Sequence, residues 1–284
     1  KMLIGSVPSL TPPNRPIPEV AETALEAKAL NKTYGRVGFF EKGRLVKAAQ
    51  DVELILRQGE TLGVVGESGS GKSTVARCVV RLIDPTSGDI NVVGANIAQM
   101  AESELRAYRQ KIQIVFQDPY RSLNPRRTVG QSIVEGPMNF GLSGTEAQSR
   151  AENLMRVVGL APEALTRFPH QFSGGQRQRI CIARALAMEP RVLIADEAVS
   201  ALDVSVQAQV LRLLQDVRER YDLAMLFITH DLRVAAQICD RIMVMQRGVV
   251  VEEGRTSEVY ANPHHPYTRS LLNAAPGRET NFAR

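Results

Sequence analysis

The stretch Gly66-Glu67-Ser68-Gly69-Ser70-Gly71-Lys72-Ser73-Thr74 decides the fold of this chain. The apolar run before it, residues 61–65, predicts a buried strand, and residues 75–82 after it predict a helix. A glycine, four residues and then Gly-Lys-Ser between a strand and a helix is the pattern of a phosphate-binding loop. The glycines let successive backbone N–H groups turn toward one anion, and the helix N-terminus adds partial positive charge. We therefore predict a nucleotide site here.

Two side chains of this loop carry the predicted chemistry. Lys72 would reach the β and γ phosphates of the nucleotide, and the Ser73 hydroxyl would ligate Mg²⁺. The alternative is a glycine-rich turn with a chance lysine. The complete spacing and the two flanking elements favour the phosphate-binding loop, which we call the P-loop.

Composition sets wide bounds on the protein. With 284 residues, 44% hydrophobic and 23% charged, the chain is typical of a globular protein, as one large domain or a main domain with a subdomain. The net charge of +5 suits a nucleotide, a nucleic acid, an anionic membrane or a plain solvated surface, and so it selects none. Cys78, Cys181 and Cys239 form no CxxC pair, which predicts buried thiols in a reducing compartment. No apolar run is long enough to span a membrane and no signal-peptide core is present, so we expect a cytoplasmic protein.

Carboxylates follow a second buried strand. Residues 192–195 are continuously apolar, as in a parallel sheet covered on both faces, and Asp196-Glu197 come directly after them. Ligands bind at the carboxyl ends of such strands. Asp196 would hold Mg²⁺ and Glu197 would polarise an attacking water. A solvated strand end is the alternative for this pair alone, and the P-loop favours the functional interpretation.

A third strand, residues 224–229, leads to His230 at the same predicted edge. A histidine at a strand end is usually structural, but beside a γ-phosphate it can donate a hydrogen bond. Tyr34 ends a predicted strand over residues 24–34, and local sequence favours adenine stacking and simple packing equally. The helical stripe over 145–160 predicts a helical insertion between two sheet strands; its apolar members are Ala147, Ala151, Leu154, Met155 and Val158.

The segment Phe172-Ser173-Gly174-Gly175-Gln176-Arg177-Gln178-Arg179 resembles the signature motif of ABC-type ATPases. Other landmarks of that family follow in order: Gln117 matches the glutamine loop, Asp196-Glu197 the second nucleotide motif, Ser200-Ala201-Leu202-Asp203 the D-loop, His230 the switch histidine and Tyr34 the adenine-stacking aromatic. The resemblance covers roughly residues 24–272. Ala198-Val199 stand where the family more often has Pro-Thr, and we expect no loss of chemistry from this.

The resemblance implies a fold and a set of roles. The expected fold is α/β, a P-loop NTPase core of ABC type with a parallel sheet, an antiparallel β subdomain and a helical insertion subdomain. The expected divisions are a proline-rich linker (1–23), the ATPase domain (24–260) with its insertion at about 118–178, and a tail (261–284). Glu197, His230 and Gln117 are the implied catalytic residues. The implied Mg²⁺ ligands are Ser73, Gln117 and Asp196. The implied ATP contacts are Tyr34, the P-loop residues 66–74, Asp196, the signature residues Ser173, Gly174, Gly175 and Gln176, and Asp203, with the signature acting on ATP held by a second ATPase domain.

Two segments look like those of the oligopeptide and dipeptide importers, namely 117–126 and 262–272. This resemblance implies transmembrane permease subunits, an external solute-binding protein, a place on the inner face of the cell membrane, and no nucleic-acid partner. His264 and His265 belong to this tail and are a poor metal site by themselves. Many relatives carry cysteines after the tail that bind an iron–sulfur cluster. Because no cysteine follows Cys239, we expect no cluster.

Two alternatives stay open at this point. One is a soluble ABC ATPase that acts on a ribosome, a nucleic acid or an enzyme assembly, although the long insertions usual in such proteins are absent from the sequence. The other is a nucleotide-binding regulator without turnover, which the complete set of catalytic landmarks disfavours. The transported substrate is not encoded in these motifs.

The two ends of the chain are similar to each other. Lys1-Met2-Leu3-Ile4-Gly5-Ser6-Val7-Pro8 and Arg269-Ser270-Leu271-Leu272-Asn273-Ala274-Ala275-Pro276 share the order base, variable, Leu, aliphatic, variable, two small or aliphatic residues, Pro. If the first residues end an earlier copy of the tail, this chain is the second half of a tandem fusion of two ATPase domains. A start codon just before Lys1 would contradict this hypothesis.

Overall fold

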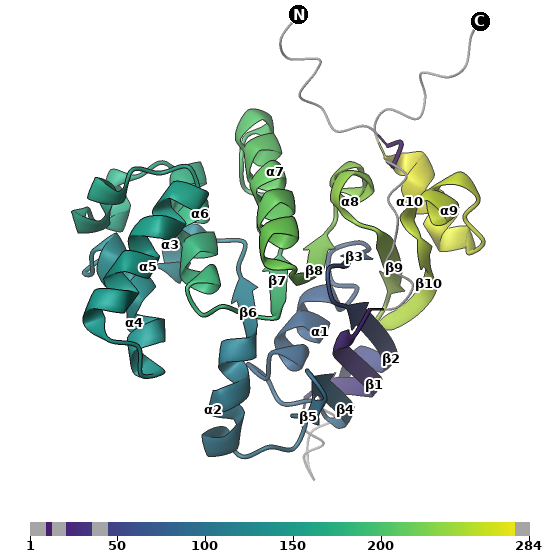
Figure 1. Cartoon of the computed structure of the whole chain (residues 1–284). Coiled ribbons are helices and arrows are strands. Elements are labelled where there is room, and N and C mark those ends of the chain that lie inside the picture. Colours follow the sequence, from purple (N-terminus) through teal and green to yellow (C-terminus); the bar gives the residue numbers. More distant parts are fainter. Residues whose placement is uncertain (1–9, 13–20, 36–44, 276–284) are drawn as a thin grey trace, which may run out of the picture.

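A computed structural model describes residues 10–12, 21–35 and 45–275. The architecture is α/β, with a six-stranded mixed sheet, a four-stranded antiparallel sheet and a group of helices inserted between two strands of the mixed sheet (Figure 1). The predicted linker (1–23) and the last nine residues of the predicted tail lie mostly or wholly outside the described residues.

The mixed sheet positions the site. Its strand order is β10-β9-β3-β8-β7-β6, in which every neighbouring pair except β10–β9 is parallel. Strands β3, β7 and β8 are buried along their whole length, because they are covered on both faces and consist mainly of apolar residues. The strands are β3 (Thr61–Val65), β6 (Ile112–Val115), β7 (Val192–Asp196), β8 (Ala224–Thr229), β9 (Arg241–Gln246) and β10 (Val249–Arg255).

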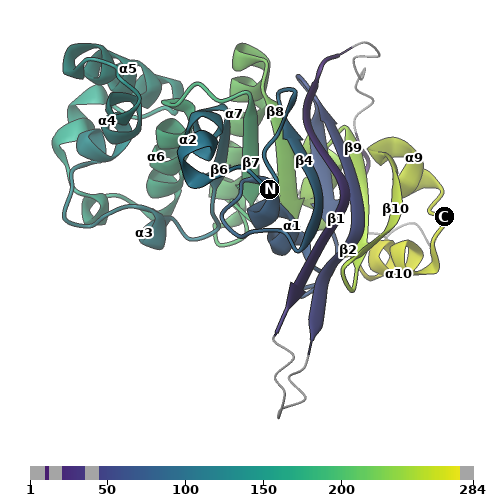
Figure 2. The ribbon, with the colours of Figure 1, turned by 90° about the horizontal axis from the view of Figure 1, so that it is seen from below.

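Two hydrophobic cores lie on opposite faces of this sheet. Alternation along a strand sends successive side chains to opposite faces, so in β8 Met225 and Phe227 join one core while Leu226 and Ile228 join the other. In the view of Figure 2 the antiparallel strands β1, β2 and β4 run between α1 and the C-terminal elements β10, α9 and α10. That sheet has the order β2-β1-β4-β5, from β1 (Thr23–Tyr34), β2 (Val46–Arg57), β4 (Ser87–Val92) and β5 (Ala95–Asn96).

Helices cover the mixed sheet and connect its strands. They are α1 (Lys72–Val79) after β3, α2 (Glu102–Lys111) before β6, α7 (Val204–Tyr221) between β7 and β8, and α8 (Leu232–Ile238) between β8 and β9. The predicted strands over 61–65, 192–195 and 224–229 and the predicted helix over 75–82 are found, with ends shifted by at most three residues. The three cysteines are buried, as their composition and spacing predict.

The insertion between β6 and β7 is helical, as predicted. It contains α3 (Pro119–Ser122), α4 (Val129–Asn139), α5 (Gly144–Val157) and α6 (Gly174–Leu186), with 3-10 helices at Pro162–Thr166 and Pro169–Gln171. The predicted apolar stripe of α5 and the residue that follows it is buried throughout; its members are Ala147, Ala151, Leu154, Met155 and Val158. These helices form the lobe at the left of Figure 1.

The chain closes with β10, α9 (Thr256–Ala261) and α10 (Pro266–Ala274), the yellow elements of Figure 1. Leu272 of α10 is buried in the same core as α6 and α7. Among the described residues, none of the helices combines the length and apolarity needed to cross a bilayer.

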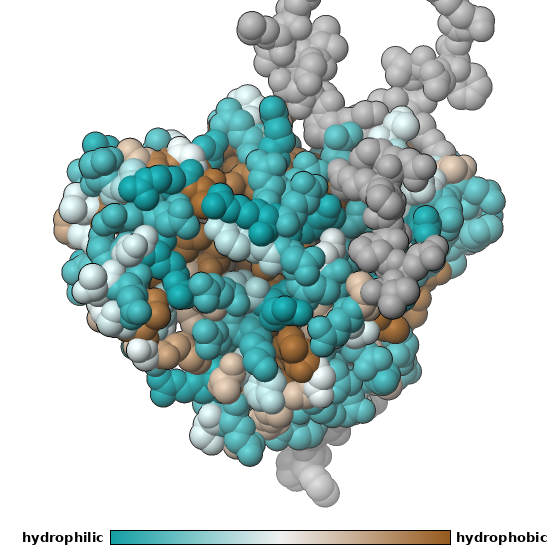
Figure 3. All heavy atoms as spheres, in the orientation of Figure 1, coloured by the Kyte–Doolittle hydropathy of each residue, from teal (hydrophilic) through white to brown (hydrophobic). Residues whose placement is uncertain are grey.

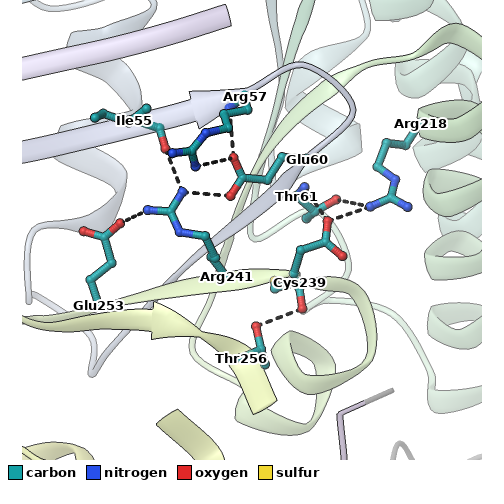
Figure 4. A network of polar contacts seen from close by, with 10 residues as sticks. Ile55, Arg57, Glu60, Thr61, Arg218, Cys239, Arg241, Glu253 and Thr256 are labelled. Atoms are coloured by element: carbon teal, nitrogen blue, oxygen red, sulfur yellow. Dashed lines mark hydrogen bonds and ion pairs between the residues drawn. The ribbon is translucent and has the colours of Figure 1, made fainter. Parts of the chain in front are cut away.

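A buried ionic network ties the two sheets together at the end opposite the P-loop (Figure 4). The Glu60 side chain is fully buried and accepts hydrogen bonds from Arg57 N (2.9 Å) and Arg241 Nη1 (2.8 Å). Arg241 also pairs with Glu253 of β10 and donates to the Ile55 carbonyl of β2. Because Glu60 and Arg241 are ion-pair partners, removing one side chain would leave the charge of the other uncompensated.

Candidate active site

The P-loop leaves the carboxyl end of β3 and is pressed against two other strands. At Gly66 (φ +150°) a Cβ would lie 2.3 Å from the Met245 carbonyl of β9, and at Gly71 (φ +106°) one would lie 2.1 Å from the Ala48 carbonyl of β2. Both positions therefore require glycine, for space as well as for backbone conformation. The loop is fixed by its contacts with β2 and β9.

Lys72, the first residue of α1, is buried and folded back onto this loop. Its Nζ donates to the carbonyls of Gly66 and Glu67, each at 2.8 Å. Burial lowers the pKa of Lys72, while the carboxylates of Glu197 and Asp196 oppose that change. These two carbonyls hold the ammonium group on the P-loop. Phosphate oxygens of a bound nucleotide would neutralise part of its positive charge.

Ser73 and Asp196 meet although they are more than 100 residues apart. The Ser73 hydroxyl donates to Asp196 Oδ1 at 2.8 Å, because β3 and β7 end at the same edge of the sheet with β8 between them. Burial raises the pKa of Asp196, opposed by the Ser73 hydrogen bond and by Arg77. A hydroxyl and a carboxylate are the hard oxygen ligands that Mg²⁺ prefers, so this pair fits the predicted metal position.

Glu197 and His230 follow β7 and β8 and lie side by side. His230 Nδ1 is 3.3 Å from Glu197 Oε2. Glu197 has φ +51°, and its N–H donates to the Ile228 carbonyl at 3.0 Å. A residue other than glycine in the left-handed region is uncommon and marks a position held by its surroundings.

Gln117, which follows β6, reaches the same edge through Ser200. Its Nε2 donates to Ser200 Oγ at 3.0 Å, and Ser200 Oγ donates to the Glu197 carbonyl at 2.9 Å. The ends of β3, β6, β7 and β8 therefore bring together five predicted site residues, Lys72, Ser73, Gln117, Asp196 and Glu197, with His230 beside them.

A cavity of about 390 Å³ opens over the P-loop. It is lined by Ser68, Gly69, Gly71, Lys72, Ser73, Thr74 and Glu197, and also by Val46, Lys47, Ala48 and Arg247. Lys47 and Arg247 are basic residues that sequence reasoning missed. They reach the cavity because the β9–β10 turn docks on β2, where Gln50 donates to the carbonyls of Arg247 and Gly248. No spacing in the sequence links them to the P-loop.

Tyr34 is paired across the antiparallel sheet with Val46, which lines this cavity. The Tyr34 side chain is 41% exposed, and Lys32 Nζ lies 5.2 Å from its ring centroid. Adenine stacking by this exposed ring stays a prediction.

The signature residues lie apart from this chain's own P-loop. Ser173 is exposed, caps α6 and accepts a hydrogen bond from Gln176 N, while Gly174 after it is half-buried. At Gly175 a Cβ would lie 2.2 Å from Val206 Cγ1 of α7, so glycine permits this close packing of α6 on α7. These residues and Asp203 line neither this cavity nor a second one of about 410 Å³ that is lined by Gly66, Glu67 and His230 among others.

The chain is similar to a known protein family, to curated relatives and to solved structures. The family model described as ABC transporter matches residues 49–200, more than half of the chain. This chain belongs to the ABC transporter family. A second family model, for the C-terminal region of oligopeptide/dipeptide transporters, matches residues 251–281.

Curated relatives and solved structures agree with the family. A probable peptide ABC transporter ATP-binding protein of Sinorhizobium fredii is 51% identical over 90% of this chain and 74% of its own length. A glutathione import ATP-binding protein of Escherichia coli is 51% identical over 85% of this chain and 39% of its own length. A dimeric ATP-binding cassette bound to ADP and phosphate matches with a TM-score of 0.72 and 30% identity, over 82% of this chain and 98% of that chain.

The family assignment confirms the predicted fold class and shows that this ABC cassette binds nucleotide and hydrolyses ATP. It does not favour the alternative of a soluble ATPase on a ribosome or nucleic acid, because the relatives are import proteins. The individual site residues and the Mg²⁺ position stay predictions.

Proposed function

We propose that this chain hydrolyses ATP to power the import of peptides or related small solutes through separate membrane permease subunits. The observation that carries the proposal is the convergence of Lys72, Ser73, Asp196, Glu197 and His230 at one edge of the sheet in a chain whose tail matches the oligopeptide/dipeptide transporter family. The printed names of relatives for peptide and glutathione import support this class of cargo.

Phosphoryl transfer to water needs positioning and charge neutralisation more than covalent chemistry. Bound Mg²⁺ would supply neutralisation of phosphate charge, with Ser73, Asp196 and Gln117 as the residues that hold it. Lys72 adds the second positive charge. Glu197 would accept hydrogen bonding from the attacking water, and His230, 3.3 Å away, would orient Glu197 and donate toward the γ-phosphate.

We infer that two ATPase domains pair to complete each site. The signature residues Ser173–Gln176 and Asp203 line neither cavity at their own P-loop, so in a pair they would contact ATP held by the partner domain. A dimeric solved structure of a bacterial ABC transporter cassette, with a TM-score of 0.73 and 30% identity, supports this arrangement. The partner would be a copy, a relative or a fused half.

A membrane partner would contact the insertion. Three large hydrophobic side chains on or near its helices are exposed: Tyr120 (63%), Met138 (47%) and Phe168 (38%). Figure 3 shows hydrophobic side chains gathered in the hollow between the insertion and α7, on a face otherwise mostly hydrophilic. Exposed apolar surface of this kind supports a protein contact. The proposed place is the cytoplasmic face of the cell membrane, with an external solute-binding protein delivering the cargo.

We propose the division into a linker (1–23), an ATPase domain (24–260) with its insertion (118–178), and an importer-type tail (261–284). A second ATPase domain fused to this one, as the tandem-fusion hypothesis has it, is one form of the proposed pair. The chain spans 39% of the glutathione import relative, a length that accommodates a second domain of this size in that protein.

Uptake in the source cells tests the proposal. Cells lacking this chain are expected to lose uptake of radiolabelled dipeptide, oligopeptide or glutathione, and the wild-type chain restores it. The matched variant Glu197→Gln, which keeps side-chain volume and removes the charge, is expected not to restore it. Unchanged uptake of all three solutes in the deletion cells would contradict the proposal.

A further inference from the structure

The tail helix α10 reaches the P-loop. The N–H of Glu67, the second residue of that loop, donates to the hydroxyl of Tyr267 on α10 at 3.1 Å, across 200 residues of sequence. One turn further along α10, Leu271 lines a second cavity of about 410 Å³ together with Glu67, Glu197 and His230. The helix therefore forms one wall of the site beside the catalytic pair.

The position of Tyr267 is fixed from the other side. The carboxylate of Glu252 in β10 accepts hydrogen bonds from the N–H groups of His264 (2.7 Å) and His265 (3.1 Å), which holds the start of the tail against the sheet. His265 Nδ1 then accepts from the N–H of Tyr267 at 3.2 Å and caps α10. Leu272 is buried in the core, and the Tyr267 side chain packs against the same core. The Tyr267 hydroxyl is thus a held acceptor and not a loose surface group.

Hydrogen bonds through the backbone of Glu67 connect the Tyr267 hydroxyl to Lys72. Glu67 gives its N–H to Tyr267 and its carbonyl to Lys72 Nζ, the latter at 2.8 Å. The Glu67 N–H and the Gly66 carbonyl belong to one planar peptide group, so fixing the N–H also fixes the direction of the Gly66 carbonyl, which accepts from Lys72 Nζ at 2.8 Å. We propose that Tyr267 is a positioning residue for nucleotide binding, acting on Lys72 through Glu67; this inference rests on the proposed function.

The consequence concerns affinity. Without the hydroxyl, Glu67 loses a partner, the loop samples further conformations, and the binding-competent fraction falls. The loss of one neutral hydrogen bond corresponds to a change of about three- to tenfold in an equilibrium constant. Because Tyr267 does not touch the attacking water, turnover at saturating ATP is not expected to change.

The test compares Tyr267→Phe with Tyr221→Phe, the same substitution at the far end of α7, in the full chain. For Tyr267→Phe we expect a rise of about three- to tenfold in the Kd for a fluorescent ATP analogue and in the KM for ATP, with kcat within about twofold of wild type. The amide of Glu67 should exchange its hydrogen faster in the nucleotide-free variant. Tyr221→Phe should match the wild type in all of these, and both variants should keep the thermal midpoint.

Three outcomes separate the claims. Wild-type affinity and wild-type exchange at Glu67 in Tyr267→Phe would overturn the positioning role and leave the proposed function standing. A wild-type protein that binds no ATP analogue would overturn the proposed function together with this inference. An equal loss in Tyr221→Phe would also overturn the inference, because the effect would then not depend on the P-loop contact.

Discussion

At the residue scale, ionisation of the buried Asp196 carboxyl destabilises the folded protein when no metal is bound. Burial raises its pKa, and the Ser73 hydrogen bond and the Arg77 and Lys72 charges only partly offset that effect. The folded chain therefore binds this proton more tightly than the unfolded chain. Stability contributed by the protonated form is full below the unfolded pKa of about 3.9 and is lost as pH rises through the raised folded pKa.

This leads to opposite effects of one substitution on stability and activity. Asp196→Asn keeps an oxygen acceptor for Ser73 and removes the buried charge, so the metal-free protein should have an equal or higher thermal midpoint and a weaker pH dependence on the acid side. Mg²⁺-dependent ATP hydrolysis should fall by about 100-fold or more. Thermal unfolding across pH and phosphate release measure the two effects. A large loss of stability of Asp196→Asn at neutral pH would contradict the inference that the ionised Asp196 destabilises the metal-free protein.

At the element scale, two helices of the insertion begin in the same way and differ in function. Ser143 caps α5 with Glu146, and Ser173 caps α6 with Gln176, each by a reciprocal pair of hydrogen bonds. The caps give both helices the same local stabilisation. Ser173 alone lies in the segment that resembles the signature motif.

The two serines provide a matched pair of variants. Ser143→Ala and Ser173→Ala should each lower the free energy of unfolding by about 1 kcal/mol, as expected for a lost N-cap. ATP hydrolysis by the assembled protein should fall strongly, by at least about tenfold, only for Ser173→Ala, because its hydroxyl would contact ATP on the partner domain. Denaturant unfolding and phosphate release distinguish the effects. Equal activities of the two variants would show that Ser173 is only a cap.

Elements with a local signal could be predicted from the sequence. The P-loop, the buried strands β7 and β8, and the apolar stripe of α5 each combine composition and spacing within about 20 residues, and parallel strand ends then bring Asp196, Glu197 and His230 to the P-loop. Lys47, Arg247 and Tyr267 could not be assigned in this way. They reach the site through the docking of a hairpin turn and of the tail helix, which depends on long-range packing and leaves no spacing in the sequence.

At the scale of the whole molecule, one sheet connects the nucleotide site to distant parts of the chain. Its carboxyl edge holds the site, while its opposite end is joined to the antiparallel sheet by Glu60 and Arg241. The insertion extends from β6 and β7, directly after Gln117 and before Asp196. A change at the γ-phosphate therefore has a short path, through Gln117, to the surface proposed to meet the permease.

The same scale contains the central claim, that this chain's own site hydrolyses ATP with Glu197 as the group that polarises water. The most direct measurement uses the native assembly isolated through a tag on this chain, with photoreactive ATP labelled on either the α or the γ phosphate. After one turnover the label attached to this chain is compared between wild type and Glu197→Gln. The account predicts that wild type keeps the α label and loses the γ label, whereas Glu197→Gln keeps both. Loss of the γ label at the wild-type rate in Glu197→Gln would contradict it.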